Sequence, residues 1–176
     1  MERVGSAPDV PRRLRGWSGG DSRGVTDDFL SPDDHTPATG DDGDEHPAGA
    51  SSLTPMLTVA DALAAVDFYR DAFGAVEQSR FTSPGGHVVA ELAIDGLRFF
   101  VVDENPEAFN VSPRSLDATT VRMNLIVDDP DAMAARAIGA GATEIFPVAD
   151  QPYGLRQGRI ADPEGHHWLI GAPLSI

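Results

Sequence analysis

The stretch TPMLTVADALAAVDFYRDAFGA, residues 54–75, decides the fold, because it joins a short strand pattern to one amphipathic helix. Asp61 is a typical N-cap residue and Gly74 a typical helix end. The apolar residues between them recur on one helical face: Ala62, Val66, Tyr69 and Phe73. This spacing predicts a helix that packs against a sheet on one side only.

The residues that follow predict three strands. The segment VEQSRFT, residues 76–82, alternates in the manner of a strand, and residues 87–103 form two β-rich runs on either side of Asp95-Gly96. An Asp-Gly pair between two such runs is typical of a tight β-hairpin. One β-α-β-β-β module is therefore complete near Asp103.

The same order begins again after a connector rich in Pro, Asn and Ser, residues 104–118. A strand pattern ends at Asp129, a second N-cap, and Pro130 suits the first helical position. A helix, a strand and a hairpin with its turn at residues 162–165 are predicted next. Aligning the two helices places Asp61 over Asp129 and Gly74 over Gly141, an internal repeat of about 68 residues.

These patterns predict an α+β fold of two βαβββ modules. Each four-stranded unit has one helix, which covers only one sheet face, so we expect the other face to curl round something. Two such units facing each other would make a curled mixed sheet around a central pocket, the usual setting of a ligand site. The predicted domain spans residues 54–176.

Residues 1–53 differ in composition, with 11 acidic and 5 basic side chains and few apolar ones. Such a segment buries too little surface to offset its ordering entropy, so we predict a disordered acidic N-terminal tail. The whole chain carries a formal net charge of -15, which disfavours nucleic acid or an anionic membrane as partner. Cysteine is absent, and no signal-peptide or membrane-spanning pattern is found, so a cytoplasmic protein is expected.

The second module carries an aromatic-Gly-x-Arg-x-Gly stretch that runs into Asp-Pro-x-Gly-His-x-Trp. Its residues are Tyr153, Gly154, Arg156, Gly158, Asp162, Pro163, Gly165, His166 and Trp168. With residues 54–173 as a whole, this signature resembles the vicinal-oxygen-chelate (glyoxalase/bleomycin-resistance/dioxygenase) superfamily, and within it the phosphonate-operon-protein-like subgroup. The resemblance implies a homodimer, but it does not decide a reaction, because the superfamily contains isomerases, dioxygenases, transferases and drug-binding proteins.

The metal-dependent members of this superfamily hold their ion with four side chains on the first and fourth strands of the two modules. The matching positions here are Thr54, Phe100, Arg122 and Leu169. A ring, a cation and an alkyl group cannot bind a divalent ion as histidines and carboxylates do, so no metal or other cofactor is expected. A substitute site from His87, Glu91 and His167 is disfavoured, since the first two lie about 13 Å apart along one strand.

Alternation along the strands predicts which side chains face the pocket. Trp168 and Ile170 are expected to pack on the helices, which leaves His167 and Leu169 on the other face. His166 is expected to be structural. The predicted ligand-binding residues are Thr58, Glu91, Phe100, Arg122, Asn124, His167 and Leu169.

We therefore expect a metal-independent protein that binds a small organic molecule, either anionic or aromatic. Whether it is an enzyme is left open; if it is, Glu91 or His167 would transfer the proton and Arg122 would hold the oxyanion. Arg122 could also serve only to pair with Glu91. The alternatives are a drug-sequestering protein of the bleomycin-resistance type and a metal-dependent lyase or dioxygenase.

Overall fold

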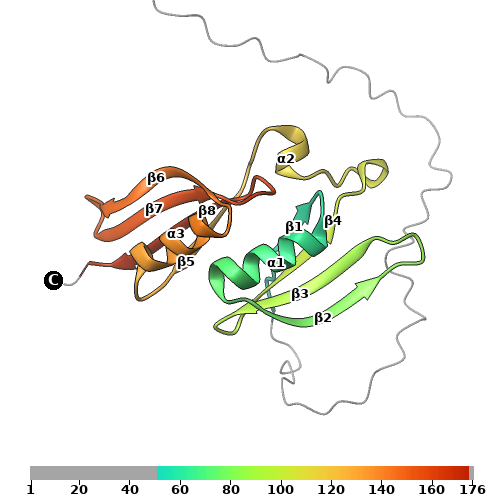
Figure 1. Ribbon diagram of the computed structural model, residues 1–176, viewed down its shortest axis with the longest axis horizontal. Helices are drawn as coiled ribbons and strands as arrows, with labels where there is room; N and C mark the ends of the chain where they lie inside the picture. Colours follow the sequence, from blue (N-terminus) through green and yellow to red (C-terminus); the bar gives the residue numbers. More distant parts are fainter. Residues whose placement is uncertain (1–50, 175–176) are drawn as a thin grey trace, which may run out of the picture. The chain divides into compact units, whose positions relative to one another are not determined.

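The computed structural model describes residues 51–174, which form two modules joined by a connector (Figure 1). Module 1 consists of β1 (Met56–Val59), α1 (Ala62–Phe73), β2 (Val76–Thr82), β3 (Val88–Ile94) and β4 (Leu97–Asp103). Module 2 consists of β5 (Arg122–Ile126), α3 (Pro130–Gly139), β6 (Thr143–Asp150), β7 (Leu155–Ala161) and β8 (His167–Pro173). The connector holds a 3-10 turn, η1 (Pro106–Ala108), and a short helix, α2 (Pro113–Leu116).

Each module contains one four-stranded mixed sheet. The strand orders are β1-β4-β3-β2 and β5-β8-β7-β6. In each sheet the first strand pairs in parallel with the fourth, and the other neighbours are antiparallel. The predicted α+β fold of two βαβββ modules is confirmed, and the two sheets stay separate and do not close into a barrel.

The helix boundaries follow the predicted signals at both ends of each helix. Asp61 accepts the N–H of Ala64 at 3.0 Å, and Asp129 accepts that of Ala132 at 2.9 Å. Gly74 ends α1 in the left-handed conformation, with φ of 70°. The second helix, α3, ends through the cap residue Ala140, and Gly141 follows at a positive φ of 114°. The N–H groups of Gly141 and Ala142 bond back to the carbonyls of Ile138 and Ala137, so the predicted glycine closes this helix as well.

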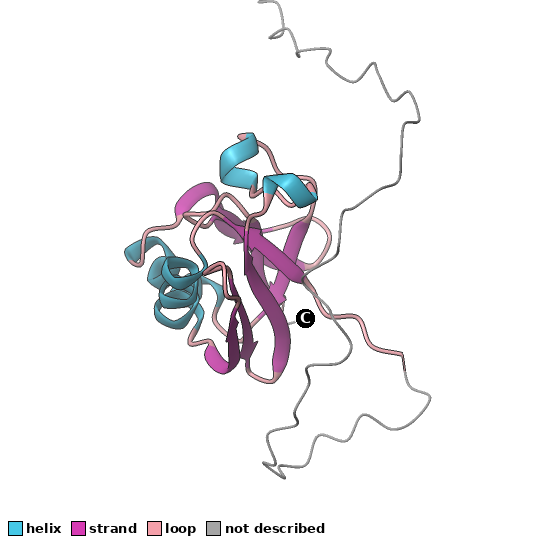
Figure 2. Ribbon diagram, turned by 90° about the vertical axis from the view of Figure 1, so that its right-hand side faces the viewer, coloured by secondary structure: helices cyan, strands magenta, loops and turns pink. Residues whose placement is uncertain are grey.

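One apolar core serves both modules. Helices α1 and α3 pack against each other, and Figure 2 shows them on one side of the strands. The ring of Trp168 on β8 lies 4.8 Å from Phe73 and 5.6 Å from Tyr69 on α1, and 6.0 Å from Phe99 on β4 (centroid distances). Aromatic pairs at these separations contribute beyond their buried area. Module 2 therefore inserts its main core ring beside the helix of module 1.

The alternation predicted for the strands is confirmed. In β3 every second residue is buried, beginning with Val88, and in β8 Trp168 and Ile170 belong to the core. Their neighbours, among them Glu91, His167 and Leu169, are only half-buried and lie on the face that no helix covers. We call this side of each sheet its helix-free face.

The connector contains a helix where the sequence pattern predicts no regular element. Ser112 caps α2 by accepting the N–H of Ser115 at 3.1 Å. The tail predicted over residues 1–53 lies outside the described residues except for 51–53, which belong to no helix or strand. Within the described part of the chain, no helix has both the length and the apolar character needed to cross a membrane.

Candidate functional site

The helix-free face of module 2 is a regular grid of side chains. Parallel pairing sets Arg122 on β5 opposite His167 on β8, and Asn124 opposite Leu169. Antiparallel pairing sets Arg159 on β7 opposite Leu169. Directly paired residues in a sheet point to the same face, so these five side chains share one surface. We call it the cationic face.

The cationic face has no negative charge of its own. The strand residues paired into the same rows include no Asp or Glu, because Glu144 pairs with Ile160 on the core side. The guanidinium of Arg159 lies over the ring of Phe146 on β6, 5.1 Å from its centroid. Such stacking fixes the orientation of an arginine fork. In a chain with net charge -15, this is a local surface of the opposite sign.

Two polar atoms on this face are buried without a partner among the described residues. They are Nδ1 of His167 and Nε of Arg159. A buried polar atom that makes no hydrogen bond costs about 1–3 kcal/mol, so such atoms in native proteins are usually satisfied by another protein group, by ordered water or by a ligand. Their two residues are diagonal neighbours, since Arg159 is paired with the residue two positions after His167. The pair therefore leaves hydrogen-bonding capacity unused at one place on this face.

The surroundings of His167 disfavour its protonated form. Burial lowers the pKa of His167 below its ordinary range, and the positive charges of Arg159 and Arg122 lower it further. Asp162 acts in the opposite direction but does not outweigh these effects. The face thus presents two permanent cations around an imidazole whose protonation they disfavour.

A chain of hydrogen bonds borders the cationic face. The hydroxyl of Tyr153 donates to Oε1 of Gln157 at 3.1 Å, and Nε2 of Gln157 donates to Oδ1 of Asn124 at 3.0 Å. Gln157 is buried, whereas Tyr153 is largely exposed. These contacts orient the Asn124 amide and leave its nitrogen available as a donor at the edge of the face.

The predicted residues of module 1 lie on a different sheet. Glu91 on β3 is paired with Phe100 on β4, on the helix-free face of that module, and Thr58 lies on β1 beside it. The Glu91 carboxylate accepts hydrogen bonds from Arg98 at 2.7 Å and from Ser79 at 3.3 Å. The Glu91–Arg122 pair considered from the sequence is therefore wrong: Glu91 has a closer cation one strand away.

The seven predicted residues thus form two groups. Module 2 brings Arg122, Asn124, His167 and Leu169 together, and module 1 holds the other three. No hydrogen bond or ion pair recorded for residues 51–174 joins the two groups. Sequence reasoning missed Arg159, Gln157 and Tyr153 as members of the site. Counting back through the turn at 162–165 could have found Arg159, because antiparallel pairing around that turn sets it opposite Leu169.

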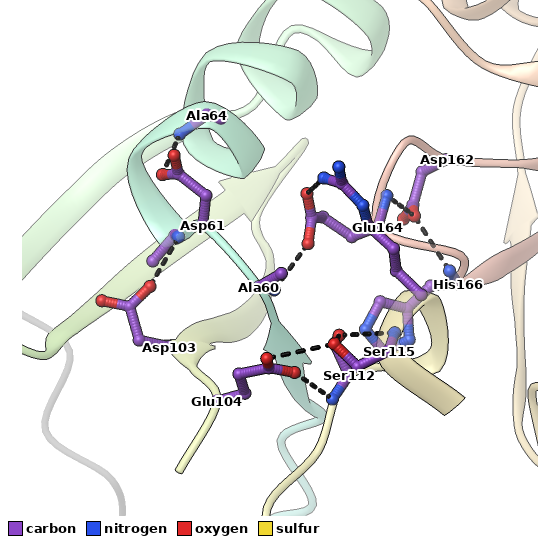
Figure 3. A network of polar contacts seen from close by, with 12 residues as sticks. Ala60, Asp61, Ala64, Asp103, Glu104, Ser112, Ser115, Asp162, Glu164 and His166 are labelled. Carbon is purple, nitrogen blue, oxygen red and sulfur yellow. Dashed lines mark hydrogen bonds and ion pairs between the residues drawn. The ribbon is translucent and has the colours of Figure 1, made fainter. Parts of the chain in front are cut away.

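The motif that carries the family resemblance serves the junction between modules. Buried Asp162 accepts hydrogen bonds from the Tyr69 hydroxyl at 2.6 Å and from Nε1 of Trp168 at 3.0 Å. Its other oxygen accepts the N–H groups of Glu164 and His166, as Figure 3 shows. Burial raises the pKa of Tyr69, with Asp162 as the second cause, so this hydroxyl stays a donor. The His166 ring contacts the Thr58 carbonyl at 2.8 Å, which fits the structural role predicted for it.

A hollow of about 390 Å³ lies where α1 begins and is acidic. Its carboxylates are already committed to the fold. Asp103 accepts the N–H groups of Ala62 at 2.7 Å and Val88 at 2.8 Å. Glu104 accepts the N–H of Ser112 at 2.9 Å (Figure 3). Hydrogen bonds from Ser112 and Ser115 lower the pKa of Glu104 accordingly. These carboxylates hold the start of α1 and the connector in place, so the acidic groups of this hollow serve the fold and not a ligand.

The residues at the family's metal positions do not fit a metal ion. Thr54 precedes β1, and the side chains of Phe100 and Leu169 carry no atom that can bind a metal ion. Arg122 is a cation and lies opposite His167. Among residues 51–174, no three His, Asp or Glu side chains lie close enough together to hold an ion. This includes the alternative set of His87, Glu91 and His167, which is split between the two modules.

Comparison with known proteins identifies the fold and its relatives. A model of the glyoxalase-like domain matches residues 55–170. An uncharacterised protein of Mycobacterium tuberculosis is 42% identical over 127 residues, which cover 70% of this chain and 75% of the relative.

Solved structures agree with that match. TioX from Micromonospora sp. ML1 is 30% identical, with a TM-score of 0.54, over 71% of this chain and all of the TioX chain. A glyoxalase/bleomycin resistance protein/dioxygenase family enzyme from Burkholderia phytofirmans PsJN is 25% identical, with a TM-score of 0.53, over 68% of this chain and 95% of the other. The resemblance seen in the sequence is thereby confirmed at the level of the superfamily.

Proposed function

The chain belongs to the glyoxalase-like domain family, and from this premise we propose that it binds a small organic anion on the cationic face of module 2. The observation that carries the proposal is the pair of buried, unpartnered atoms, Nδ1 of His167 and Nε of Arg159, on a surface without acidic side chains. An oxyanion is a natural partner for a guanidinium that has a free N–H and a fixed plane.

The body of the ligand would contact apolar groups that lie between the charges. Leu169 separates Asn124 from Arg159 in one row of the grid, and the exposed ring of Phe146 continues that row on β6. Ligand pockets commonly combine such apolar contact with a few polar anchors. We therefore propose a carboxylate on an aromatic or branched aliphatic frame as the ligand class.

We further propose that binding does not depend on a metal, and that the chain is of the phosphonate-operon-protein-like type. The donor set at the family's metal positions supports the first proposal, because Arg122 supplies a fixed positive charge where an ion would gather ligand oxygens. The Asp-Pro-x-Gly-His-x-Trp motif supports the second. If the protein is an enzyme, His167 is a better proton acceptor than Glu91, since Glu91 is held by Arg98.

The test is the affinity for benzoate and sulfate, measured by NMR titration of the full chain. R122M and R159M should each weaken binding about tenfold to a hundredfold, the loss of a charge-assisted hydrogen bond. The matched control is R156M, on the same strand β7 but paired with Asp131 and Asp150 on the other side of the sheet. It removes the same charge from the chain and should leave the affinity unchanged.

Equal affinities for wild type, R122M and R159M would refute the proposal. Loss of affinity in R156M to the same degree would show that only the net charge matters. A chelator added to the wild-type protein should leave the benzoate affinity unchanged, and a loss would instead support the metal-dependent alternative.

A further inference from the structure

We infer that the cationic face binds its anion together with a proton, which His167 takes up, so that this site selects oxyanions able to accept a hydrogen bond from an imidazolium. The inference rests on the proposed anion site. It goes beyond that site by assigning His167 a change of charge on binding. Its basis is the position of His167 between the two arginines.

Four groups determine the charge around His167. Arg122 faces it from β5, directly opposite in the parallel pair, and Arg159 faces it from β7, one row along. The other two groups are close to His167 in the sequence: His166 directly precedes it, and Asp162 lies in the turn before β8. Asp162 is the only acid in this set, and its two oxygens are occupied by four donors. The imidazole therefore meets a net positive field.

Without an anion this field disfavours a third positive charge. The lowered pKa of His167 has burial as its first cause, followed by Arg159, with Arg122 a further contribution. A bound oxyanion next to the two guanidiniums cancels their field and adds a negative charge near the ring. The unpartnered Nδ1 then gains an acceptor for a proton, so the bound state favours imidazolium.

The sign of the linkage follows from these two states. The pKa of His167 is below its ordinary range in the free protein and higher in the complex. Affinity is therefore greatest where His167 is already protonated in the free protein, and it falls as the pH rises through the free and then the bound pKa. Each unit of difference between the two pKa values changes the affinity about tenfold.

Sulfate is the probe, because its own charge is constant over the range in which histidine titrates. We expect the wild-type protein to bind sulfate about tenfold more tightly near pH 5.5 than near pH 8. H167Q keeps a polar side chain but cannot titrate, and should lose most of this ratio. H87Q removes a histidine from module 1 and should keep this ratio of affinities. It is therefore the control for the change in the protein's net charge with pH.

The outcomes separate this inference from the site itself. A wild-type ratio that H167Q leaves unchanged overturns the proton coupling, even if R159M still weakens binding and thus supports the anion site. Failure of the wild-type protein to bind sulfate and benzoate at either pH overturns both. A ring pKa of His167 that rises on addition of sulfate, followed by NMR, would directly support the coupling, and an unchanged or lower pKa would contradict it.

Discussion

Module 1 and module 2 repeat the same order of elements, with matching caps at Asp61 and Asp129, yet their helix-free faces differ in chemistry. On module 1 the half-buried Glu91 carboxylate is neutralised by Arg98 from the next strand. On the cationic face of module 2, Arg122 and Arg159 have no acidic side chain in their rows of paired strand residues, and Nδ1 of His167 has no hydrogen-bond partner among the described residues. The repeat thus supplies two similar scaffolds, and the residues that are not repeated give their helix-free faces different charges.

The turn between the third and fourth strands also differs between the modules, in its length and its burial. In module 1 a two-residue turn, Asp95-Gly96, joins β3 to β4 with both residues at positive φ, and both are exposed. In module 2 the longer turn at residues 162–165 is buried at Asp162 and Glu164 and contacts module 1. Because His167 begins β8 directly after this turn, the contact with module 1 also positions the cationic face.

The largest effect is expected from D162A compared with D103A. Both carboxylates hold backbone N–H groups, but Asp162 also holds Tyr69 and Trp168 in the core. Its loss leaves buried donors without partners at about 1–3 kcal/mol each, so we expect the free energy of unfolding to fall by about 3–5 kcal/mol. D103A should cost about 1–2 kcal/mol, since its two partners are only partly buried. Urea unfolding measures both.

An equal fall in the free energy of unfolding for D162A and D103A would show that the turn of module 2 contributes no more to stability than the strand end of module 1. A loss in D162A that is confined to the first of two unfolding transitions would show instead that the modules unfold independently.

A smaller effect is expected from G165A compared with G96A. Both glycines have left-handed φ angles, 85° and 82°, so alanine strains both equally, by about 1 kcal/mol. At Gly165 the added Cβ would also lie 2.9 Å from the backbone N of Arg114, whereas at Gly96 nothing lies within 4 Å. The connector must shift in G165A, so we expect a total loss of about 2–4 kcal/mol. Thermal unfolding of both variants checks the difference, and a loss in G96A as large as that in G165A would contradict it.

Much of the scaffold can be predicted because its signals are local. Alternating apolar residues identify the strands and their core sides, and Asp61 and Gly74 identify the ends of α1. The motif around Asp162 is visible as a pattern, but its contact with Tyr69 is not, because the two are 93 positions apart in the chain. The short helix α2 escapes prediction because one turn has no periodicity, although Ser112-Pro113 is a typical helix start.

The site is predicted only in part for a related reason. Alternation tells which face of its own sheet a side chain is on, but not how two sheets are arranged. It therefore places Glu91 and Arg122 in one pocket, whereas Glu91 pairs within module 1. Arg159 is overlooked because its place depends on pairing across a turn, and its unpartnered Nε can be recognised only when its neighbours are known.

The smallest effect is expected from E91Q, and it tests the comparison between the modules most directly. Glu91 is a predicted catalytic and binding residue, and its pairing with Arg98 makes it a local partner on the module 1 face. Arg98 is 47% exposed, so solvent screens the pair and the substitution should change the free energy of unfolding by less than about 1 kcal/mol. The side-chain amide that E91Q introduces can still accept hydrogen bonds from Arg98 and Ser79.

If the cationic face of module 2 alone binds the anion, E91Q should leave the benzoate dissociation constant within about twofold of wild type, while R159M in parallel raises it about tenfold or more. A change of about tenfold in E91Q would mean that the module 1 face reaches the ligand after all, from the same chain or from a second copy. Measuring the change at two protein concentrations distinguishes those cases, because only the second depends on association.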